Sequence, residues 1–285
     1  MARWLSLVSR KKSGKRPSTN ESIMKLDEKV VLVTGAGTGV GAATARLLAA
    51  KGCRVTVNYR SSQSEAESVV ESIEEAGGEA FSCQADVAED DEARALVKAT
   101  RDRFGQLDAL VNNAGITAFI PFDDLDAVTD DVWRRLFQVN VVGAFHCARA
   151  AASVMRETCG EDGAEIVNVG SIAGLKATGS CIPYAASKAA LHNLTVALAR
   201  TFAPTIRVNA VAPGFITGRW LQEGLGEESY EATKAAFEKA MPLQAVCDPE
   251  DVAQAIVSLL EGSDLVTGQI LGCDGGMSIA EPTSI

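Results

Sequence analysis

Short apolar runs alternate with longer helical patterns along most of the chain. The runs are rich in β-branched residues and lie at about 30–34, 53–59, 79–84, 107–112, 164–170, 205–212 and 268–272. Continuous apolar runs of this length are typical of strands that are buried on both faces of a parallel sheet. The alternation with helices predicts an α/β fold, with a doubly wound sheet of about seven parallel strands flanked by helices.

Composition narrows the class of protein. With 285 residues and 47% hydrophobic content, the chain can bury one large core, and we expect a single domain over 26–285. The net charge of −10 argues against nucleic acid or an anionic membrane surface as a partner. No apolar run approaches the length of a membrane span, and we expect a cytoplasmic protein.

Cysteine and histidine give no sign of a metal or of disulfide bonds. The seven cysteines are scattered without C-x-x-C pairs, so the sequence indicates neither a disulfide framework nor a zinc site. His146 and His192 lie in separate helical patterns, where packing is a commoner role than metal ligation. We therefore expect no metal ion.

The first 25 residues differ from the rest of the chain. No acidic residue precedes Glu21, and the basic residues of this segment include Arg3, Arg10, Lys11, Lys12, Lys15 and Arg16. A basic segment without acids is typical of organelle-targeting sequences and of tails that bind anionic surfaces. The alternative is a disordered extension ahead of a protein that begins at Met24. We expect the second, over residues 1–25.

A glycine-rich turn follows the first predicted strand. The run Val30–Val33 leads into T-G-A-G-T-G-V-G at 34–41, and a helical pattern then continues to Gly52. Glycines let the backbone approach a pyrophosphate, and the free amides and dipole of a helix N-terminus favour its negative charge. The segment predicts a Rossmann-type dinucleotide site, with a simple tight turn as the alternative.

A tyrosine and a lysine are spaced by one helical turn. Tyr184 and Lys188 lie in an alanine-rich helical pattern, so both side chains point to the same side of the helix. A free tyrosine has a pKa near ~10, and a fixed cation nearby stabilises the phenolate. We therefore expect Lys188 to lower the pKa of Tyr184 and to make the phenol an acid-base catalyst. A solvated surface pair is the alternative.

These features and others resemble the short-chain dehydrogenase/reductase family over about residues 26 to 280. The family's T-G-x-x-x-G-x-G stands at 34–41. Its other motifs stand as Asn112-Asn113-Ala114-Gly115, Asn140, Ser171, Tyr184 with Lys188, and Pro213-Gly214. Each motif alone is modest, but their order and spacing are specific.

The resemblance implies a mechanism. Tyr184 would be the general acid toward a carbonyl oxygen, or the base toward an alcohol, and Ser171 would hold and polarise that oxygen. Lys188 would lower the pKa of Tyr184 and bind the nicotinamide ribose. Asn140 would fix a water that links Lys188 to solvent. The resemblance also implies cofactor contacts at Gly35, Thr38, Gly39, Val40, Gly41, Asn58, Tyr59, Arg60, Ser61, Asp86, Val87, Asn113, Ala114, Gly115, Tyr184, Lys188, Pro213, Gly214 and Ile216.

The end of the second predicted strand indicates which cofactor is used. An NAD enzyme normally has a carboxylate there for the ribose 2′-hydroxyl, and residues 57–62 contain none. Arg60 can instead bind a 2′-phosphate through charge-assisted hydrogen bonds, with Ser61 adding a donor. We therefore expect NADP (as NADPH) rather than NAD. Thr38 stands where many NADP-using relatives have a basic residue, which keeps NAD open.

The substrate is less well defined. The segment at about 215–245 would be a substrate lid, as in the family, and the second-strand end is similar to that of 3-oxoacyl-thioester reductases. The acidic segment 123–126 stands where carrier-protein reductases have basic residues, so a coenzyme A thioester or a free ketone stays open. We expect an NADP-dependent carbonyl reductase that resembles its relatives in forming a homotetramer. The alternatives are an NAD-linked sugar or polyol dehydrogenase and a non-catalytic nucleotide-sensing protein.

Overall fold

Seven parallel strands form one sheet in the order β3-β2-β1-β4-β5-β6-β7. The computed structural model describes residues 24–160 and 163–280. The strands are β1 (Val30–Val33), β2 (Arg54–Tyr59), β3 (Glu79–Gln84), β4 (Ala109–Asn112), β5 (Ala164–Val169), β6 (Ile206–Pro213) and β7 (Ile270–Cys273). Each lies within two residues of a predicted apolar run, and the predicted fold class is confirmed.

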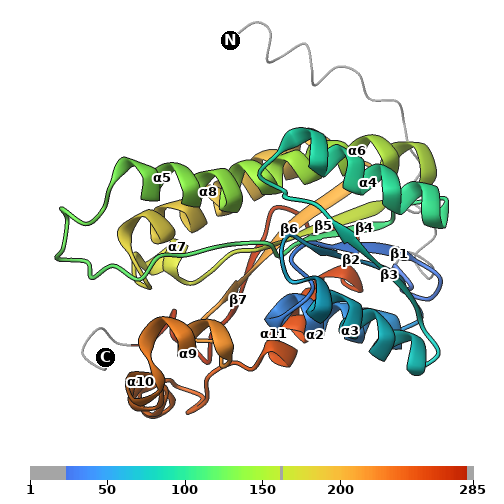
Figure 1. Ribbon diagram of the computed structural model, residues 1–285. Coiled ribbons are helices and arrows are strands. Elements are labelled where there is room, and N and C mark those ends of the chain that lie inside the picture. The colour runs from blue at the N-terminus through green and yellow to red at the C-terminus, as the bar shows by residue number, and fades with distance from the viewer. Residues whose placement is uncertain (1–23, 161–162, 281–285) are drawn as a thin grey trace, which may run out of the picture.

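Helices cover both faces of the sheet, as Figure 1 shows. On one face lie α2 (Gly39–Ala50), α3 (Gln63–Glu75) and α11 (Pro249–Leu260). On the other lie α4 (Asp90–Phe104), α6 (Ala144–Thr158) and α8 (Ile182–Phe202). The remaining helices are α5 (Asp130–Phe137), η1 (Gln138–Gly143), α7 (Ala173–Lys176), α9 (Arg219–Leu225) and α10 (Glu227–Ala240).

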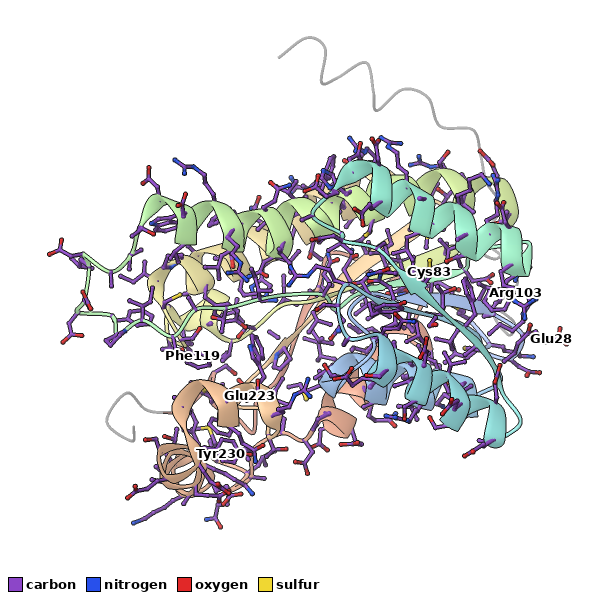
Figure 2. The ribbon with its side chains drawn as sticks, in the orientation of Figure 1. Glu28, Cys83, Arg103, Phe119, Glu223 and Tyr230 are labelled. Carbon is purple, nitrogen blue, oxygen red and sulfur yellow. The ribbon has the colours of Figure 1, made fainter. Side chains whose placement is uncertain are left out.

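Figure 2 shows which end of this sheet is available for chemistry. Glu28, just before β1, and Arg103, in the last turn of α4, lie at the amino end of the strands. Phe119, Glu223 and Tyr230 lie at the opposite end, where the strands finish. In an open parallel sheet, ligands bind at the carboxyl ends of the strands, at the point where the strand order reverses. Here that point lies between β1 and β4.

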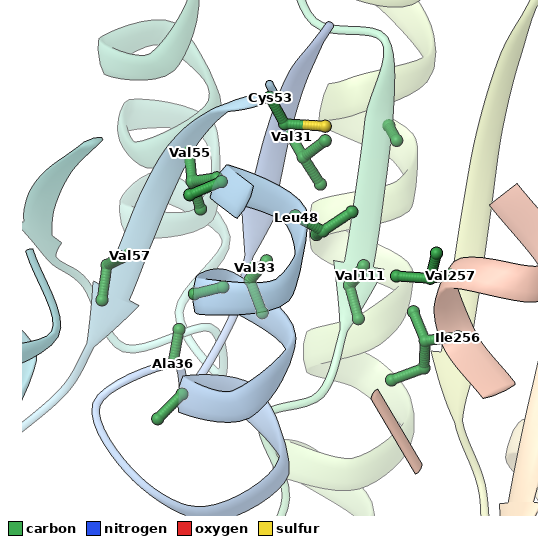
Figure 3. Packing of buried hydrophobic residues seen from close by; sticks show 14 of the residues in the cluster. Val31, Val33, Ala36, Leu48, Cys53, Val55, Val57, Val111, Ile256 and Val257 are labelled. Atoms are coloured by element: carbon green, nitrogen blue, oxygen red, sulfur yellow. The ribbon is translucent and has the colours of Figure 1, made fainter. Parts of the chain in front are cut away.

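The strands divide their side chains between two apolar clusters. In β1, Val31 and Val33 pack against α2 and its neighbours, whereas Val30 and Leu32 pack against α4 and α6. Figure 3 shows Leu48 of α2 packed over the first of these clusters. Burial of each such side chain stabilises the fold by about 1.5–3 kcal/mol. The two-sided burial explains why these strands read as continuous apolar runs rather than alternating ones.

One predicted helix is irregular in the structure. The sequence predicts a single helix over about 130–157, but the segment Gln138–Gly143 forms wider π-helical turns between α5 and α6. Asn140 lies in these turns and is buried. Such π-helical segments often occur at functional sites. Periodicity at 3.6 residues does not reveal them.

Three sequence expectations concern the N-terminal extension, membrane spans and metal sites. The basic extension predicted for 1–25 lies outside the described residues, except for Met24 and Lys25. Within the described ranges, no helix is both long enough and apolar enough to cross a membrane. The same residues contain no group of three or more acidic, histidine or cysteine side chains arranged to hold a metal ion.

Candidate active site

A cavity of about 1320 Å³ opens at the carboxyl ends of the strands. It runs from the glycine-rich turn and the end of β2 to Ser171, Tyr184 and Lys188. Of the residues that the sequence predicts for catalysis or cofactor binding, Gly41 and Asn140 alone do not line it. The fold therefore brings residues as far apart in the chain as Gly35 and Ile216 to one continuous surface.

The glycine-rich turn is held close to the end of β4. A methyl group placed on Gly35 would lie 3.0 Å from the Cα of Ala114, and Gly35 and Gly39 both have positive φ. Thr38 caps α2 with its backbone alone, since no side-chain cap bond is present there. The first amides of this helix therefore face the cavity, where an anionic phosphate would be favoured.

Gly41 is a packing glycine. A Cβ at Gly41 would lie 2.4 Å from the carbonyl oxygen of Gly35 and 2.5 Å from Nδ2 of Asn113. The sequence predicts a contact between Gly41 and the cofactor, but the structure places it under the turn, outside the cavity lining. Its lack of a side chain lets α2 approach the turn.

We expect Gly41→Ala to disrupt this turn, because the added methyl group clashes with two groups that are fixed by their own hydrogen bonds. The variant should lose about 1–3 kcal/mol of stability and bind the dinucleotide more weakly. Thermal unfolding and fluorescence titration with NADPH measure the two effects. Gly272→Ala is the matched control, since its new Cβ would have no neighbour closer than 3.9 Å. Equal effects of both substitutions would contradict the packing role.

Asn58 and Asn113 fasten the turn to the sheet. The amide N–H of Gly35 donates to Oδ1 of Asn58 (3.1 Å), and Asn58 Nδ2 donates to the carbonyl oxygens of Cys83 and Ala85. Asn113 Nδ2 donates to the carbonyl oxygens of Thr34 and Gly35 at 2.9 and 3.0 Å. Both asparagines line the cavity, but these bonds already occupy their side-chain amides. These bonds hold the glycine-rich turn in position against the sheet.

Arg60 lies at the open rim of this half of the cavity. Its side chain is 51% exposed, and its Nη1 lies 3.8 Å from a carboxylate oxygen of Asp86. Ser61 and Ser62 line the cavity beside it. An exposed guanidinium next to two hydroxyls fits a phosphate monoester better than a ribose hydroxyl. Asp86 and Val87 also line this part of the cavity.

Tyr184 and Ser171 form the wall of the central part of the cavity. Both side chains are nearly buried, at 8% exposure each. Burial raises the pKa of Tyr184 to about 12, and a hydrogen bond with the Ser171 hydroxyl opposes this shift. The sequence predicts a lowered pKa for Tyr184, but the net shift in the structure is upward because burial is the largest effect. A buried phenol with a raised pKa holds its proton at neutral pH, as a proton donor must.

Lys188 lies behind Tyr184. Its Nζ is 5.7 Å from the centre of the tyrosine ring and donates to the carbonyl oxygen of Val169 at 2.8 Å. Burial lowers the pKa of Lys188 to about 8. His192, one turn further along α8, has its pKa lowered to about 4 by burial and by Lys188, so it is neutral at neutral pH. Lys188 is therefore the cation of this part of the site.

Asn140 lies behind the wall of the cavity. Its Oδ1 accepts from the amide N–H of Ile116 (2.8 Å), and its Nδ2 donates to the Ile116 carbonyl oxygen and to Ser187 Oγ, both at 3.0 Å. A methyl group on Gly115 would lie 3.4 Å from Asn140 Oδ1 and 3.5 Å from Lys188 Nζ. Asn140 thus joins η1 to the segment after β4 and to α8, close to Lys188.

Comparison with known proteins agrees with this geometry. The family model described as "Enoyl-(Acyl carrier protein) reductase" matches residues 35–278. The chain belongs to the short-chain dehydrogenase/reductase family. A solved structure of a member from Burkholderia xenovorans superposes with a TM-score of 0.81 at 33% identity, covering 89% of this chain and 99% of that one.

Relatives in this family are named as reductases. A protein of Streptomyces violaceoruber described as a ketoacyl reductase of the granaticin polyketide synthase is 40% identical over 247 residues, covering 87% of this chain and 95% of the relative. A 3-oxoacyl-[acyl-carrier-protein] reductase of Synechocystis sp. is 38% identical, covering 88% and 98%. The sequence-based prediction of an oxidoreductase of the short-chain dehydrogenase/reductase family is confirmed.

In Figure 1, α9 and α10 lie at the lower left of the molecule, and residues of both helices, among them Trp220 and Phe237, line the cavity. In the chain these helices follow Pro213, Gly214 and Ile216. The sequence predicts these three residues as cofactor-binding positions, and all three line the cavity. Thr217 lines it too, but its hydroxyl is hydrogen-bonded to Asp248. Phe215 packs against Tyr230 and Phe237 of α10, which ties this helix to the end of β6.

Sequence reasoning missed two aromatic residues of this short-chain dehydrogenase/reductase. The rings of Trp220 (α9) and Tyr184 meet edge to face with centroids 6.2 Å apart. Phe119, after β4, packs on Gly224 so closely that a methyl group there would lie 2.0 Å from its ring. Both line the cavity, and Figure 2 shows Phe119 facing α9. The only sequence signal for these two cavity-lining aromatic residues is the presence of aromatic residues in segments 116–122 and 215–221.

Proposed function

We propose that the protein is an NADP-dependent reductase that converts a carbonyl to a secondary alcohol, with Tyr184 as the proton donor. The observation that carries this proposal is the buried pair of hydroxyls on Tyr184 and Ser171 at the cavity wall, with the Lys188 cation behind them. Two hydroxyls on one wall can both reach a single substrate oxygen. The relatives named as ketoacyl and 3-oxoacyl reductases support the same reaction.

Each residue of this group has a definite task. Ser171 donates a hydrogen bond to the carbonyl oxygen and polarises it. Tyr184 gives its proton to the same oxygen as negative charge develops there. Lys188, held by the Val169 carbonyl oxygen, binds the ribose and passes a proton back to the phenol. The nicotinamide cofactor, when bound, supplies the hydride.

The remainder of the cavity fits the cofactor. The amides at the start of α2 would bind its pyrophosphate, held in place by Asn58 and Asn113. Arg60 and Ser61 would bind the 2′-phosphate, and Asp86 and Val87 would contact the adenine. The segment at 215–245, which includes α9 and α10, would act as a lid over the substrate.

The alternatives fit the site less well. A sugar or polyol needs several hydrogen-bond partners, whereas the substrate half of the cavity has aromatic and aliphatic walls that include Phe119, Ile120 and Trp220. A non-catalytic nucleotide sensor would have no need of Lys188 and Tyr184 in a buried site, where the charge of Lys188 is costly to desolvate. The geometry therefore favours carbonyl reduction.

A direct assay tests the proposal. NADPH and NADH oxidation would be followed at saturating cofactor against ketones, aldehydes, quinones, 3-oxoacyl thioesters and sugars. We expect turnover with NADPH and at least one ketone. Turnover restricted to polyols with NAD, or no turnover despite nucleotide binding, would contradict the proposed function.

The pH dependence of reduction should reflect Lys188. Because burial lowers the pKa of Lys188 to about 8, the side chain carries its charge below that pH and loses it above. Tyr184, with a pKa of about 12, stays protonated across this range. We expect kcat/KM for reduction to fall as pH rises through about 8. In Lys188→Arg, whose guanidinium keeps its charge, the fall should be absent even though the rate is lower. A fall at the same pH in both proteins would assign it to another group.

A further inference from the structure

Aromatic side chains make up much of the substrate end of the cavity, and the charged residues Lys176, Arg219 and Glu223 also line the cavity. Beyond Tyr184 its walls come from the segment after β4 and from the lid helices, and they include Phe119, Ile120, Phe122, Trp220, Leu221 and Phe237. Arg219 also lines this end, but its guanidinium lies 3.5 Å from Glu223 and 3.6 Å from Glu65 of α3. The cation is therefore matched by two carboxylates of the protein and is poorly placed to bind an anionic substrate.

The rim beside this end carries negative charge. Phe122 lines the cavity, and the exposed residues Asp123, Asp124 and Asp126 follow it directly. Exposed charges act over a screening length of about 8–10 Å at physiological salt. An anionic thioester or an acidic protein that delivers a substrate here would be repelled, whereas a neutral molecule would not.

We propose, on the basis of the proposed function above, that the substrates are uncharged ketones with a fused or aromatic ring next to the carbonyl, bound as free molecules. Trp220 and Phe119 determine this specificity. Trp220 already meets the ring of Tyr184 edge to face, so a flat ring near the reacting carbonyl extends an existing aromatic stack. Phe119, seated on Gly224, forms the opposite aromatic wall.

Three probes test this specificity: 2-tetralone as the aromatic bicyclic ketone, 2-butanone as the small ketone and acetoacetyl-coenzyme A as the anionic thioester. We expect kcat/KM for 2-tetralone to exceed that for each of the others at least tenfold. Trp220→Ala and Phe119→Ala should each lower kcat/KM for 2-tetralone about tenfold more than for 2-butanone. Trp133→Ala, on α5 and outside the cavity, is the matched control and should change neither.

The charge argument has its own test. Reversing the rim with Asp123→Lys, Asp124→Lys and Asp126→Lys together should lower KM for acetoacetyl-coenzyme A several-fold, and added salt should remove the gain. 2-Tetralone serves as the neutral reference. If acetoacetyl-coenzyme A is the better substrate of the unmodified protein, or if Trp220→Ala affects both ketones equally, this specificity is wrong. If no probe supports NADPH oxidation, it is the proposed function that fails.

A separate observation concerns two thiols beside the lid. The Sγ atoms of Cys247 and Cys273 lie 3.9 Å apart, and the Cys247 thiol donates to the Cys273 carbonyl oxygen at 3.1 Å. The segment that leads from β6 to α9 lies beside both cysteines. The amide of Gly214 donates to the Cys273 carbonyl oxygen, and the backbone of Cys247 is hydrogen-bonded to Phe215 and Thr217. Both thiols are free.

We infer that Cys247 and Cys273 are a site of reversible disulfide formation by a hydroperoxide. Cys273, the more exposed of the two, attacks the peroxide oxygen as a thiolate, forming an S–O bond and releasing hydroxide. Cys247 then attacks that sulfur, and the second oxygen leaves as water. In sum, two thiols and one H₂O₂ give one disulfide and two waters. Contact with the Cys247 thiol lowers the pKa of the Cys273 thiol, which favours the first step. The sulfurs need to approach to about 2.05 Å.

Stoichiometric hydrogen peroxide on the full-length protein tests this inference. We expect loss of two thiols, a peptide that links Cys247 to Cys273 by mass spectrometry, and a fall in kcat that dithiothreitol reverses, because the bond fixes the base of the lid. Cys247→Ser and Cys273→Ser should each prevent the linkage, whereas Cys147→Ser, which removes a buried thiol of α6, should not. A linkage between other cysteines would overturn the inference. So would inactivation by peroxide that persists in a protein that carries both Cys247→Ser and Cys273→Ser.

Discussion

Tyr184→Phe should reduce turnover by about 10²- to 10⁴-fold, the range that a general acid contributes. The substitution removes the phenolic oxygen and keeps the ring, so the edge-to-face contact with Trp220 should persist. Affinity for NADPH should change little, because Lys188 and the cradle around Gly35 remain. Steady-state kinetics with a ketone and fluorescence titration with NADPH measure the two quantities.

A matched control shows whether the fall in rate comes from the loss of the Tyr184 proton or from the loss of any buried tyrosine hydroxyl. Tyr230, in α10, is also buried, and its hydroxyl oxygen accepts a long hydrogen bond from the amide of Gly218 (3.3 Å). Tyr230→Phe should keep most of the wild-type rate. If Tyr184→Phe retains more than a few per cent of that rate, the proton donor has been assigned to the wrong residue.

Arg60→Ala should weaken binding of NADPH by about 10- to 100-fold and leave binding of NADH nearly unchanged. A hydrogen bond to an ionised group contributes about 1.5–3 kcal/mol, which corresponds to that range of affinity. Since the Arg60 side chain is 51% exposed, added salt should narrow the preference for NADPH. Isothermal titration with both cofactors at low and high salt measures these changes.

The control for Arg60 is an arginine of equal exposure. Arg94 on α4 is also 51% exposed and pairs with Asp90, away from the cavity. Arg94→Ala makes the same change in net charge and should affect neither cofactor. If the wild-type protein binds NADPH and NADH equally, or if Arg60→Ala weakens both alike, then Arg60 is a solvated residue and NAD becomes the better assignment.

The fold could be predicted because local signals and buried packing agree. Strands such as Val30–Val33 are apolar on both faces since helices cover both sides of the sheet. The doubly wound parallel sheet also follows from the α/β alternation and from the glycine-rich turn after the first strand. The π-helical turns around Asn140 were not predictable, because they arise where η1 meets the segment after β4 and α8.

The candidate site was predictable where a residue type carries the chemistry. Tyr184, Ser171 and Arg60 lie on the cavity surface as the sequence predicts, although their roles stay predictions. The bonds and contacts by which Asn58 and Gly41 shape the turn were not predictable, because they depend on a partner 23 positions away and on close backbone contact. The raised pKa of Tyr184 likewise depends on burial, which only the tertiary structure shows.

The central claim is that hydride reaches a carbonyl carbon while Tyr184 protonates its oxygen. The most direct test uses NADPH deuterated at the transferring position of the nicotinamide C4, with a ring ketone, and mass spectrometry of the product. We predict a secondary alcohol that carries one deuterium on its carbinol carbon, formed by the wild-type protein and nearly absent with Tyr184→Phe. A product with deuterium elsewhere, such as a reduced carbon–carbon double bond, or equal label from both proteins, would contradict the claim.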